Sequence, residues 1–152
     1  MTDEQLLKLK NELDTDPRSL GYAGKNPSQI KIIINGSPEV VSQPIAGSKL
    51  WENLYNESRW VAMGAASSDA ALTAEQRNAA QAIVDGGSQQ TAQIDVSTDP
   101  FKSAVDFVVA ASVLDAAQGA AVKALGDATV SRATAIDLPY VRTSDIRKAE
   151  NL

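Results

Sequence analysis

The sequence predicts an all-α protein, built as a single small domain of about five to seven helices over residues 1–152. Three observations predict this class. Apolar residues recur at helical spacing in most segments, capping side chains precede those segments, and proline or glycine follows them. We also expect one short extended hairpin or loop, near residues 37–47 or 88–98, where proline-rich or alternating stretches interrupt the helical pattern.

The first predicted helix begins at the amino end of the chain. Thr2 and Gln5 fit a capping box. Leucines follow on one helical face, at Leu6, Leu9 and Leu13. Asp16-Pro17 ends this helix, because the residue before a proline avoids the helical conformation.

Asn26-Pro27 predicts the start of a second helix, since a capping side chain is followed by proline at the first helical position. The isoleucine-rich stretch 30–34 allows two interpretations. Its spacing favours a helix that stops at Gly36, whereas its β-branched residues favour a strand. We favour the helix and keep the strand as the alternative.

Two further helices are predicted in the middle of the chain. One spans about Ser48 to Met63. Its apolar side chains share one face, at Leu50, Trp51, Leu54, Tyr55 and Val61 or Ala62, and its charged ones lie off that face, at Glu52, Glu57 and Arg59. The other begins at a capping box of Thr73 and Gln76 and stops at Gly86-Gly87.

Asp99-Pro100 repeats the cap-and-proline signal and opens another helix. An alanine-rich run, 116–135, follows. Its small side chains are predicted to let a second helix approach closely: Ala117, Ala120, Ala121, Ala124 and Ala128. Because glycine weakens a helix by roughly 1 kcal/mol relative to alanine, we expect a bend or break near Gly126-Asp127.

Thr143 is predicted to cap a last, basic helix that runs to Leu152. The terminal segments 1–16 and 140–152 are candidates for arms that reach a neighbouring subunit.

The composition excludes most catalytic and metal chemistry. The chain has no cysteine and no histidine, which removes thiolate and imidazole ligands together with the commonest general base. Capping explains the acids at helix starts, and no glycine-rich phosphate loop leads into a helix. We therefore expect no enzyme activity, no catalytic residue, no metal and no cofactor.

Negative charge is concentrated in the middle of the sequence. Segment 61–131 holds eight acids and three bases, so it carries the whole formal charge of −5. No basic stripe for phosphate groups is present. We interpret the middle as a solvated acidic surface. The sharper alternative is a wall past which DNA moves without adhering.

Neither a leader nor a membrane segment is expected. The amino end lacks the basic start and apolar run of a signal peptide. No stretch approaches the roughly 20 apolar residues that a membrane helix needs. We expect a protein made and kept in solution, with no membrane partner.

Three aromatic residues are candidates for contacts with a partner. Trp51, Tyr55 and Trp60 lie on or near one predicted helix. Trp and Tyr are over-represented among the residues that dominate binding at interfaces. Packing in the core is the simpler alternative.

Three basic residues near the carboxyl end are the second candidate surface. Arg142, Arg147 and Lys148 give the last helix its positive charge. They fit nucleic acid or an acidic neighbour, and a solvated surface helix is the simpler alternative.

Three stretches together carry a family resemblance. The first is DPRSLGYAG at residues 16–24, where relatives resemble DPLGRGYAGM, and the second is Asp99-Pro100-Phe101. The third is Ser131-Arg132-Ala133 followed by Leu138-Pro139 and by VRTSDIRKA at residues 141–149. In order and spacing they resemble a family of small tailed-bacteriophage proteins encoded among virion structural genes. Arg18-Ser19-Leu20 and the stretch 30–34 depart from the family pattern.

The resemblance implies a non-enzymatic structural protein of the virion of a long-tailed phage, made in the cytoplasm of the bacterial host. The favoured role is a head-tail connector of the neck, either a head-to-tail adaptor or a head-completion protein. Such a subunit forms an oligomeric ring, commonly of twelve copies, between the portal protein and the tail or stopper proteins. DNA passes nearby without specific binding.

Three alternatives remain at this point. The first stays within the virion: a tail-completion, tail-terminator or assembly protein. The second is a small regulator that contacts nucleic acid through its C-terminal helix, against which the net charge argues. The third is an enzyme that works without histidine or cysteine.

Overall fold

The computed structural model describes residues 1–56 and 58–152. These residues are mainly helical, but they form nine helices and two small antiparallel sheets. The prediction of five to seven helices is therefore wrong. A short extended element was expected near 37–47 or 88–98, and strands lie in both ranges, at 38–42, 45–46 and 93–94. A fourth strand, at 127–131, was not predicted.

Contacts within the chain divide it into two compact units. Unit 1 comprises residues 1–41 and 129–152, and unit 2 comprises residues 42–128. Where one domain over residues 1–152 was expected, each unit has a hydrophobic core of its own.

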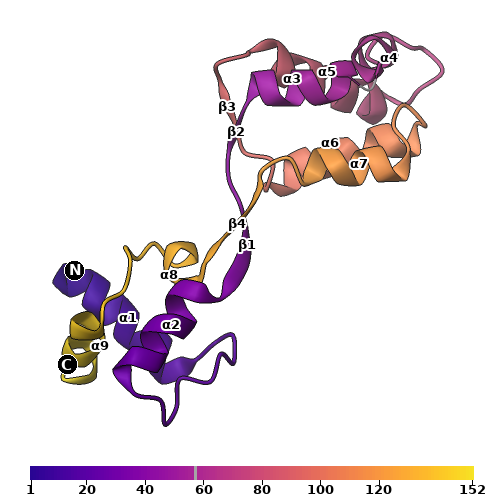
Figure 1. The fold of residues 1–152 in the computed structure, drawn as a ribbon. Coiled ribbons are helices and arrows are strands. Elements are labelled where there is room, and N and C mark those ends of the chain that lie inside the picture. The colour runs from indigo at the N-terminus through magenta and orange to yellow at the C-terminus, as the bar shows by residue number, and fades with distance from the viewer. Residues whose placement is uncertain (57) are drawn as a thin grey trace. The chain divides into compact units, whose positions relative to one another are not determined.

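Unit 1 is built on the packing of three helices from the two ends of the chain (Figure 1). Helices α1 and α2 each pack against α9, and α2 also packs against α8. Strands β1 and β4 pair in a two-stranded sheet, and each runs across the division between the units. The elements are α1 (Asp3–Thr15), α2 (Pro27–Gly36), β1 (Pro38–Ser42), β4 (Asp127–Ser131), α8 (Arg132–Ala135) and α9 (Thr143–Glu150).

The terminal segments, expected as arms, form part of the unit 1 core. Leu9 of α1 and Ile146 and Ala149 of α9 are fully buried. Burying one large aliphatic side chain stabilises a fold by roughly 1.5–3 kcal/mol. The remaining buried core residues are Tyr22, Ile30, Ile34, Ala133, Leu138 and Val141.

The stretch 30–34 is helical, as favoured over the strand. Its helix, α2, begins at a capping box in which Asn26 Oδ1 accepts the backbone N–H groups of Ser28 and Gln29, each at 3.0 Å. Near the other end of α2, the Asn35 amide accepts the Val141 N–H at 3.0 Å and donates to the Val141 carbonyl at 2.9 Å. This pair of bonds ties the chain before α9 to α2.

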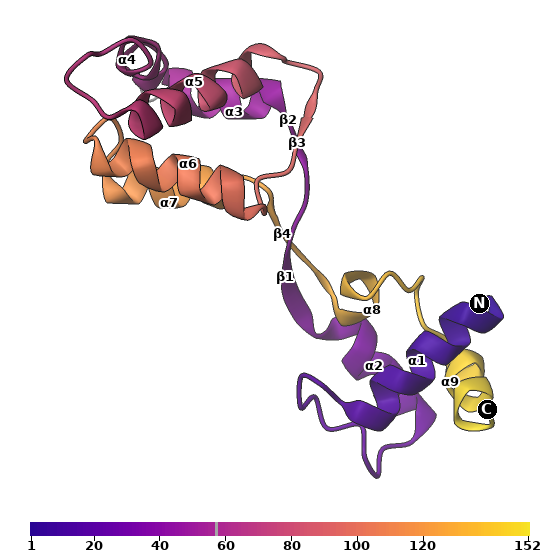
Figure 2. The ribbon, with the colours of Figure 1, turned by 180° about the vertical axis from the view of Figure 1, so that it is seen from behind.

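Unit 2 is organised around one central helix (Figure 2). Helix α5 packs against α3, α4 and α6, and α7 packs against α6. Strands β2 and β3 are antiparallel, with Ile45 opposite Ile94. The elements are β2 (Ile45–Ala46), α3 (Gly47–Asn56), α4 (Arg59–Ala66), α5 (Ala74–Ser88), β3 (Gln93–Ile94), α6 (Asp99–Ala110) and α7 (Ala116–Lys123).

The unit 2 core is aliphatic, and a glycine allows a close contact between two of its helices. Gly119 of α7 lies against α6, where a Cβ atom would sit 2.5 Å from Val109 Cγ2. The larger fully buried side chains of this core are Leu50, Leu54, Met63, Ile83, Leu114, Val96, Val105, Val108 and Val122. The interior of unit 2 thus needs a residue without a side chain at position 119.

Two predicted helices are each divided in the structure. The helix expected over 48–63 is interrupted after Asn56, and Ser58 adopts a left-handed backbone (φ 56°) before α4 begins. The prediction for Glu57 lies outside the described residues. The sequence has no proline or glycine at this break. The helical spacing of apolar residues therefore continues across it and predicts a single helix.

The alanine-rich run 116–135 contains α7, β4 and α8 instead of one bent helix. The change occurs at the predicted point, Gly126-Asp127. Gly126 is buried, its carbonyl accepts the Gln43 N–H at 2.8 Å, and a Cβ atom there would lie 2.6 Å from Val96 Cγ2. Packing at this glycine outweighs the helix propensity of the alanines.

Unit 2 is a continuous segment whose two ends are joined by the bond between Gln43 and Gly126. We expect residues 42–128, expressed alone, to fold into a helical protein with one cooperative unfolding transition, because its core is complete within the segment. Circular dichroism during urea titration measures this. A spectrum of an unfolded chain in buffer would contradict the division.

Candidate functional site

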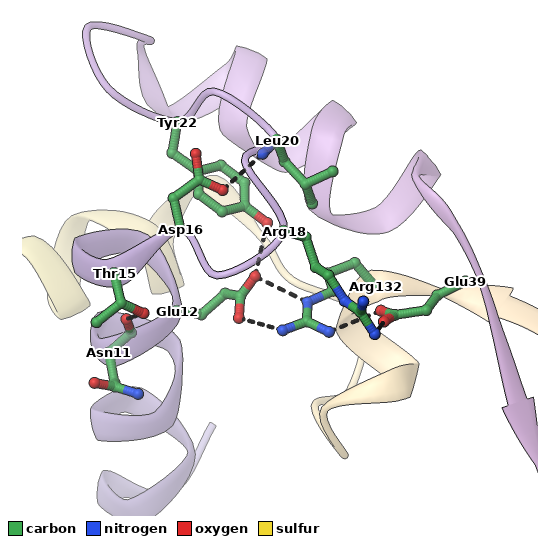
Figure 3. Close-up of polar contacts among 9 residues, drawn as sticks. All are labelled: Asn11, Glu12, Thr15, Asp16, Arg18, Leu20, Tyr22, Glu39 and Arg132. Carbon is green, nitrogen blue, oxygen red and sulfur yellow. Dashed lines mark hydrogen bonds and ion pairs between the residues drawn. The ribbon is translucent and has the colours of Figure 1, made fainter.

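Charged and hydroxyl side chains converge in unit 1 at Arg132 (Figure 3). Its guanidinium binds Glu12 through two parallel bonds, Nε to Oε1 at 2.9 Å and Nη2 to Oε2 at 2.7 Å. Its Nη1 donates to Glu39 Oε2 at 2.8 Å. Arg18 Nη2 lies 2.6 Å from Glu39 Oε1, and the Tyr22 hydroxyl donates to Glu12 Oε1 at 3.2 Å. We call these five residues the Arg132 network.

The turn after α1 places Tyr22 in this network. The Asp16 carboxylate accepts the N–H groups of Leu20 at 2.7 Å and Gly21 at 2.8 Å. Gly21 (φ 80°) and Gly24 (φ 73°) take left-handed conformations on either side of Tyr22. The turn thereby points the Tyr22 ring into the core and its hydroxyl toward Glu12.

Arg132 is positioned by the start of a helix. It is the first residue of α8, whose cap Ser131 accepts the Thr134 N–H at 3.2 Å. The Arg132 N–H itself donates to the Ser37 carbonyl at 3.0 Å. The side chains of Arg132 and Glu12 are 11% and 4% exposed, so the bidentate pair is shielded from water.

The electrostatics hold the network in one charge state. Hydrogen bonding to Arg132 keeps the pKa of Glu39 below its usual value. Hydrogen bonds to Glu12 raise the pKa of Arg132 still further above neutrality. Burial, together with the nearby Glu12 charge, raises the pKa of Tyr22. At neutral pH the network thus contains ionised Arg132 and Glu39 and a neutral Tyr22.

The network has the chemistry of a structural clamp. Both oxygens of Glu12 and both oxygens of Glu39 already bind a donor within unit 1. A general base or a nucleophile needs an oxygen that can reach a substrate. We therefore assign the Arg132 network to the stability of unit 1. Sequence reasoning missed it, although Arg18, Tyr22 and Arg132 all lie in the stretches that carry the family resemblance.

Individual residues of those three stretches have structural roles in the fold. Asp16 and Tyr22 build the first turn, and Ser19 adopts a left-handed backbone (φ 53°) at the position where the family pattern has glycine. In the second stretch, α6 is capped by Thr98, whose hydroxyl accepts the Phe101 N–H, so Asp99 is the first helical residue and not the cap. The third stretch supplies buried core residues: Ala133, Leu138, Val141, Ile146 and Ala149.

The predicted aromatic residues come together where α3 meets α4. Trp51 and Tyr55 stack with ring centroids 4.7 Å apart and planes at 17°, and Trp51 meets Trp60 edge-on at 6.5 Å. Trp60 packs on the unit 2 core, where a Cβ atom on Gly87 would lie 2.7 Å from its ring. Tyr55 is 56% exposed and the neighbouring Val61 is 77% exposed. We call Trp51, Tyr55, Trp60 and Val61 the aromatic corner.

The predicted basic residues lie on the exposed side of α9 or beside it. Arg142, Arg147 and Lys148 are all exposed, and none forms an ion pair with another described residue. Arg142 precedes α9, and its N–H donates to Asp145 Oδ2 at 3.0 Å. The helix therefore begins at Thr143, which the sequence had suggested as its cap.

The alanine face of α7 points away from the interior. Ala117, Ala120, Ala121 and Ala124 are exposed, while Ala128 lies outside the helix, in β4. The close helix approach predicted for these alanines is made by Gly119 on the opposite side of α7.

Within residues 1–56 and 58–152, no three or more acidic side chains gather as a metal site would require. No helix there combines the length and the apolar character needed to cross a membrane.

Replacing Arg132 with leucine should lower the free energy of unfolding of unit 1 by about 3–5 kcal/mol, because Glu12 is left buried without its counter-charge. Arg18→Leu is the matched control. Its side chain is 63% exposed, so its loss should be no more than about 1 kcal/mol. Urea denaturation followed by circular dichroism measures both. Equal losses would show that Arg132 does not clamp the unit.

Tyr22→Phe should be less stable than the unsubstituted chain near neutral pH, by about 0.5–1.5 kcal/mol, because one hydrogen bond is lost. Because folding raises the pKa of Tyr22, the neutral hydroxyl stabilises the fold at pH values below 10.0, the ordinary pKa of tyrosine. This contribution to stability is lost as the pH rises above that value. The stability gap should therefore shrink in alkali. Urea titrations at neutral and alkaline pH test this, with Tyr140→Phe as the control at an exposed ring. A gap independent of pH would contradict the assignment.

Comparisons with models of protein families, with curated proteins and with solved structures find no match for this chain.

Proposed function

We propose that this chain is a non-enzymatic structural subunit of a tailed-phage virion, a head-to-tail adaptor or head-completion protein of the neck that assembles into a ring between portal and tail. The proposal combines the family resemblance with one structural observation, the exposed aromatic corner of unit 2. A structural subunit acts by burying such a surface against a neighbour.

The aromatic corner has the physical properties of a binding hot spot. Tyr55 and Val61 expose most of their apolar surface, while Trp51 and Trp60 are half-buried beneath or beside them. The stacked rings are already ordered by contacts within the chain. Binding therefore immobilises few side chains, which keeps the entropic cost of association low. Tyr and Trp are the residues most enriched in such positions.

The charge distribution supports the same role. Unit 2 contains ten acids and five bases, whereas unit 1 contains nine of each. The eight acids of segment 61–131 are all exposed: Asp69, Glu75, Asp85, Asp95, Asp99, Asp106, Asp115 and Asp127. A negatively charged surface repels phosphate, so DNA passes it without adhering.

The proposal is tested in particles of the phage that encodes the chain. Mass spectrometry of purified particles should detect it, and cryo-electron microscopy should place it in the neck. The double variant Tyr55→Ser, Val61→Ser should fold normally yet enter particles at least about 30-fold less, since hot-spot truncations cost that much in affinity. Circular dichroism confirms the folding of the purified variant.

A matched control replaces two equally exposed apolar residues of unit 1. Leu7 and Ile32 are 61% and 69% exposed, and Leu7→Ser, Ile32→Ser should enter particles at the unsubstituted level. Infectious particles that lack the chain would refute the proposed function. Equal incorporation of both double variants would show that the aromatic corner does not take part in the proposed function.

A further inference from the structure

We propose that copies of this chain associate head to tail, with the basic side of α9 in one copy binding the acidic surface of unit 2 in the next. This deepens the proposed function and rests on it for the ring. The occupant of the α9 surface is thus a second copy of the same chain.

The α9 surface offers cations that the chain itself leaves unpaired. Arg142, Arg147 and Lys148 are exposed and make no ion pair within the described residues, whereas Lys8 pairs with Asp137 and Lys10 with Asp14. Of the two acids in α9, Asp145 is buried and accepts the Arg142 N–H. Glu150 alone is exposed, in the last turn. The three cations are therefore available to an anionic partner.

The helix that carries Arg147 and Lys148, and that Arg142 directly precedes, is held firmly. Ile146 and Ala149 are fully buried in the unit 1 core, and α9 packs against both α1 and α2. A charged surface on such a support keeps its spacing when a partner binds, which favours specific pairing.

The complementary charge lies on unit 2. Its net charge is −5, and each of its described acids is exposed, Glu52 included. One of its five bases, Lys123, is already paired with Asp106. Several carboxylates thus remain without a cation, and their negative charge is complementary to the positive charge of the α9 surface.

Because the two surfaces differ, each contact leaves one surface of each kind free. Such a contact is heterologous, and repetition closes a ring when the rotation between copies permits it. Charge also fixes the orientation, since two α9 surfaces repel one another, as do two copies of unit 2.

Ionic strength distinguishes this contact from the behaviour of an ordinary acidic protein. Copies that carry −5 repel one another as whole molecules, so added salt should promote their association by screening. If opposite charges pair head to tail, added salt should instead weaken the association. We expect self-association of the full chain, measured by sedimentation, to weaken by about tenfold or more as salt rises from low to physiological concentration.

The substitutions separate the α9 surface from general charge effects. Arg142→Gln, Arg147→Gln, Lys148→Gln should weaken self-association at low salt by about tenfold. The control Lys10→Gln, Lys25→Gln, Lys31→Gln removes the same charge elsewhere in unit 1 and should change it by less than about threefold. Equal effects of the two triple variants, or association that strengthens with salt, would overturn the proposal.

Cross-linking identifies the partner surface directly. A carbodiimide should join Lys148 of one copy to a carboxylate of unit 2 in another, recognised by mixing isotope-labelled and unlabelled chains. Cross-links of Lys148 to unit 1 acids only, or salt-dependent binding of duplex DNA that needs Arg142, Arg147 and Lys148, would refute it. A virion ring that contains the chain without the Lys148 link would refute this contact alone, while absence from the virion would refute the proposed function.

Discussion

The bidentate pair between Arg132 and Glu12 is the contact on which unit 1 depends. The two residues are 120 positions apart in the sequence, and their side chains are almost fully removed from water. Taking either charge out of water costs several kcal/mol, which only a well-placed partner offsets. Neither end of the chain therefore satisfies its buried charge alone. The core between α1, α2 and α9 is likewise formed by segments from the two ends of the chain.

Unit 2 has the opposite character. Its residues form one continuous segment, its core is aliphatic, and its described acids are all on the surface. A buried ion pair thus stabilises unit 1, whereas the described acidic side chains of unit 2 lie on its surface. The division by contacts coincides with a division by charge, since unit 1 is formally neutral and unit 2 carries the whole −5. A predominantly acidic surface over an aliphatic core is consistent with the proposal that unit 2 acts through its surface.

Local signals in the sequence predict much of this fold, and tertiary contacts decide the rest. The caps Thr2, Asn26 and Thr73 all begin helices, because a capping bond depends only on residues three positions apart. The left-handed Ser58 that interrupts the helix has no signal in the periodicity of the sequence. The strand after Gly126 follows from packing against a distant segment, for which periodicity also gives no signal. The same limit applies to the candidate site. Exposure of Tyr55 follows from where α3 meets α4, and the Arg132 network joins residues that no sequence spacing connects.

The family resemblance is distributed unequally over the two units. Its first and third stretches lie mostly in unit 1, where Asp16, Tyr22 and Arg132 hold the turn and the clamp, and only Asp99-Pro100-Phe101 lies in unit 2. Of these residues, Arg132 has the largest structural role, because replacing it leaves the buried Glu12 carboxylate without its counter-charge. Tyr55 and Val61 of unit 2, by contrast, are exposed, so their side chains are available for contact with another protein.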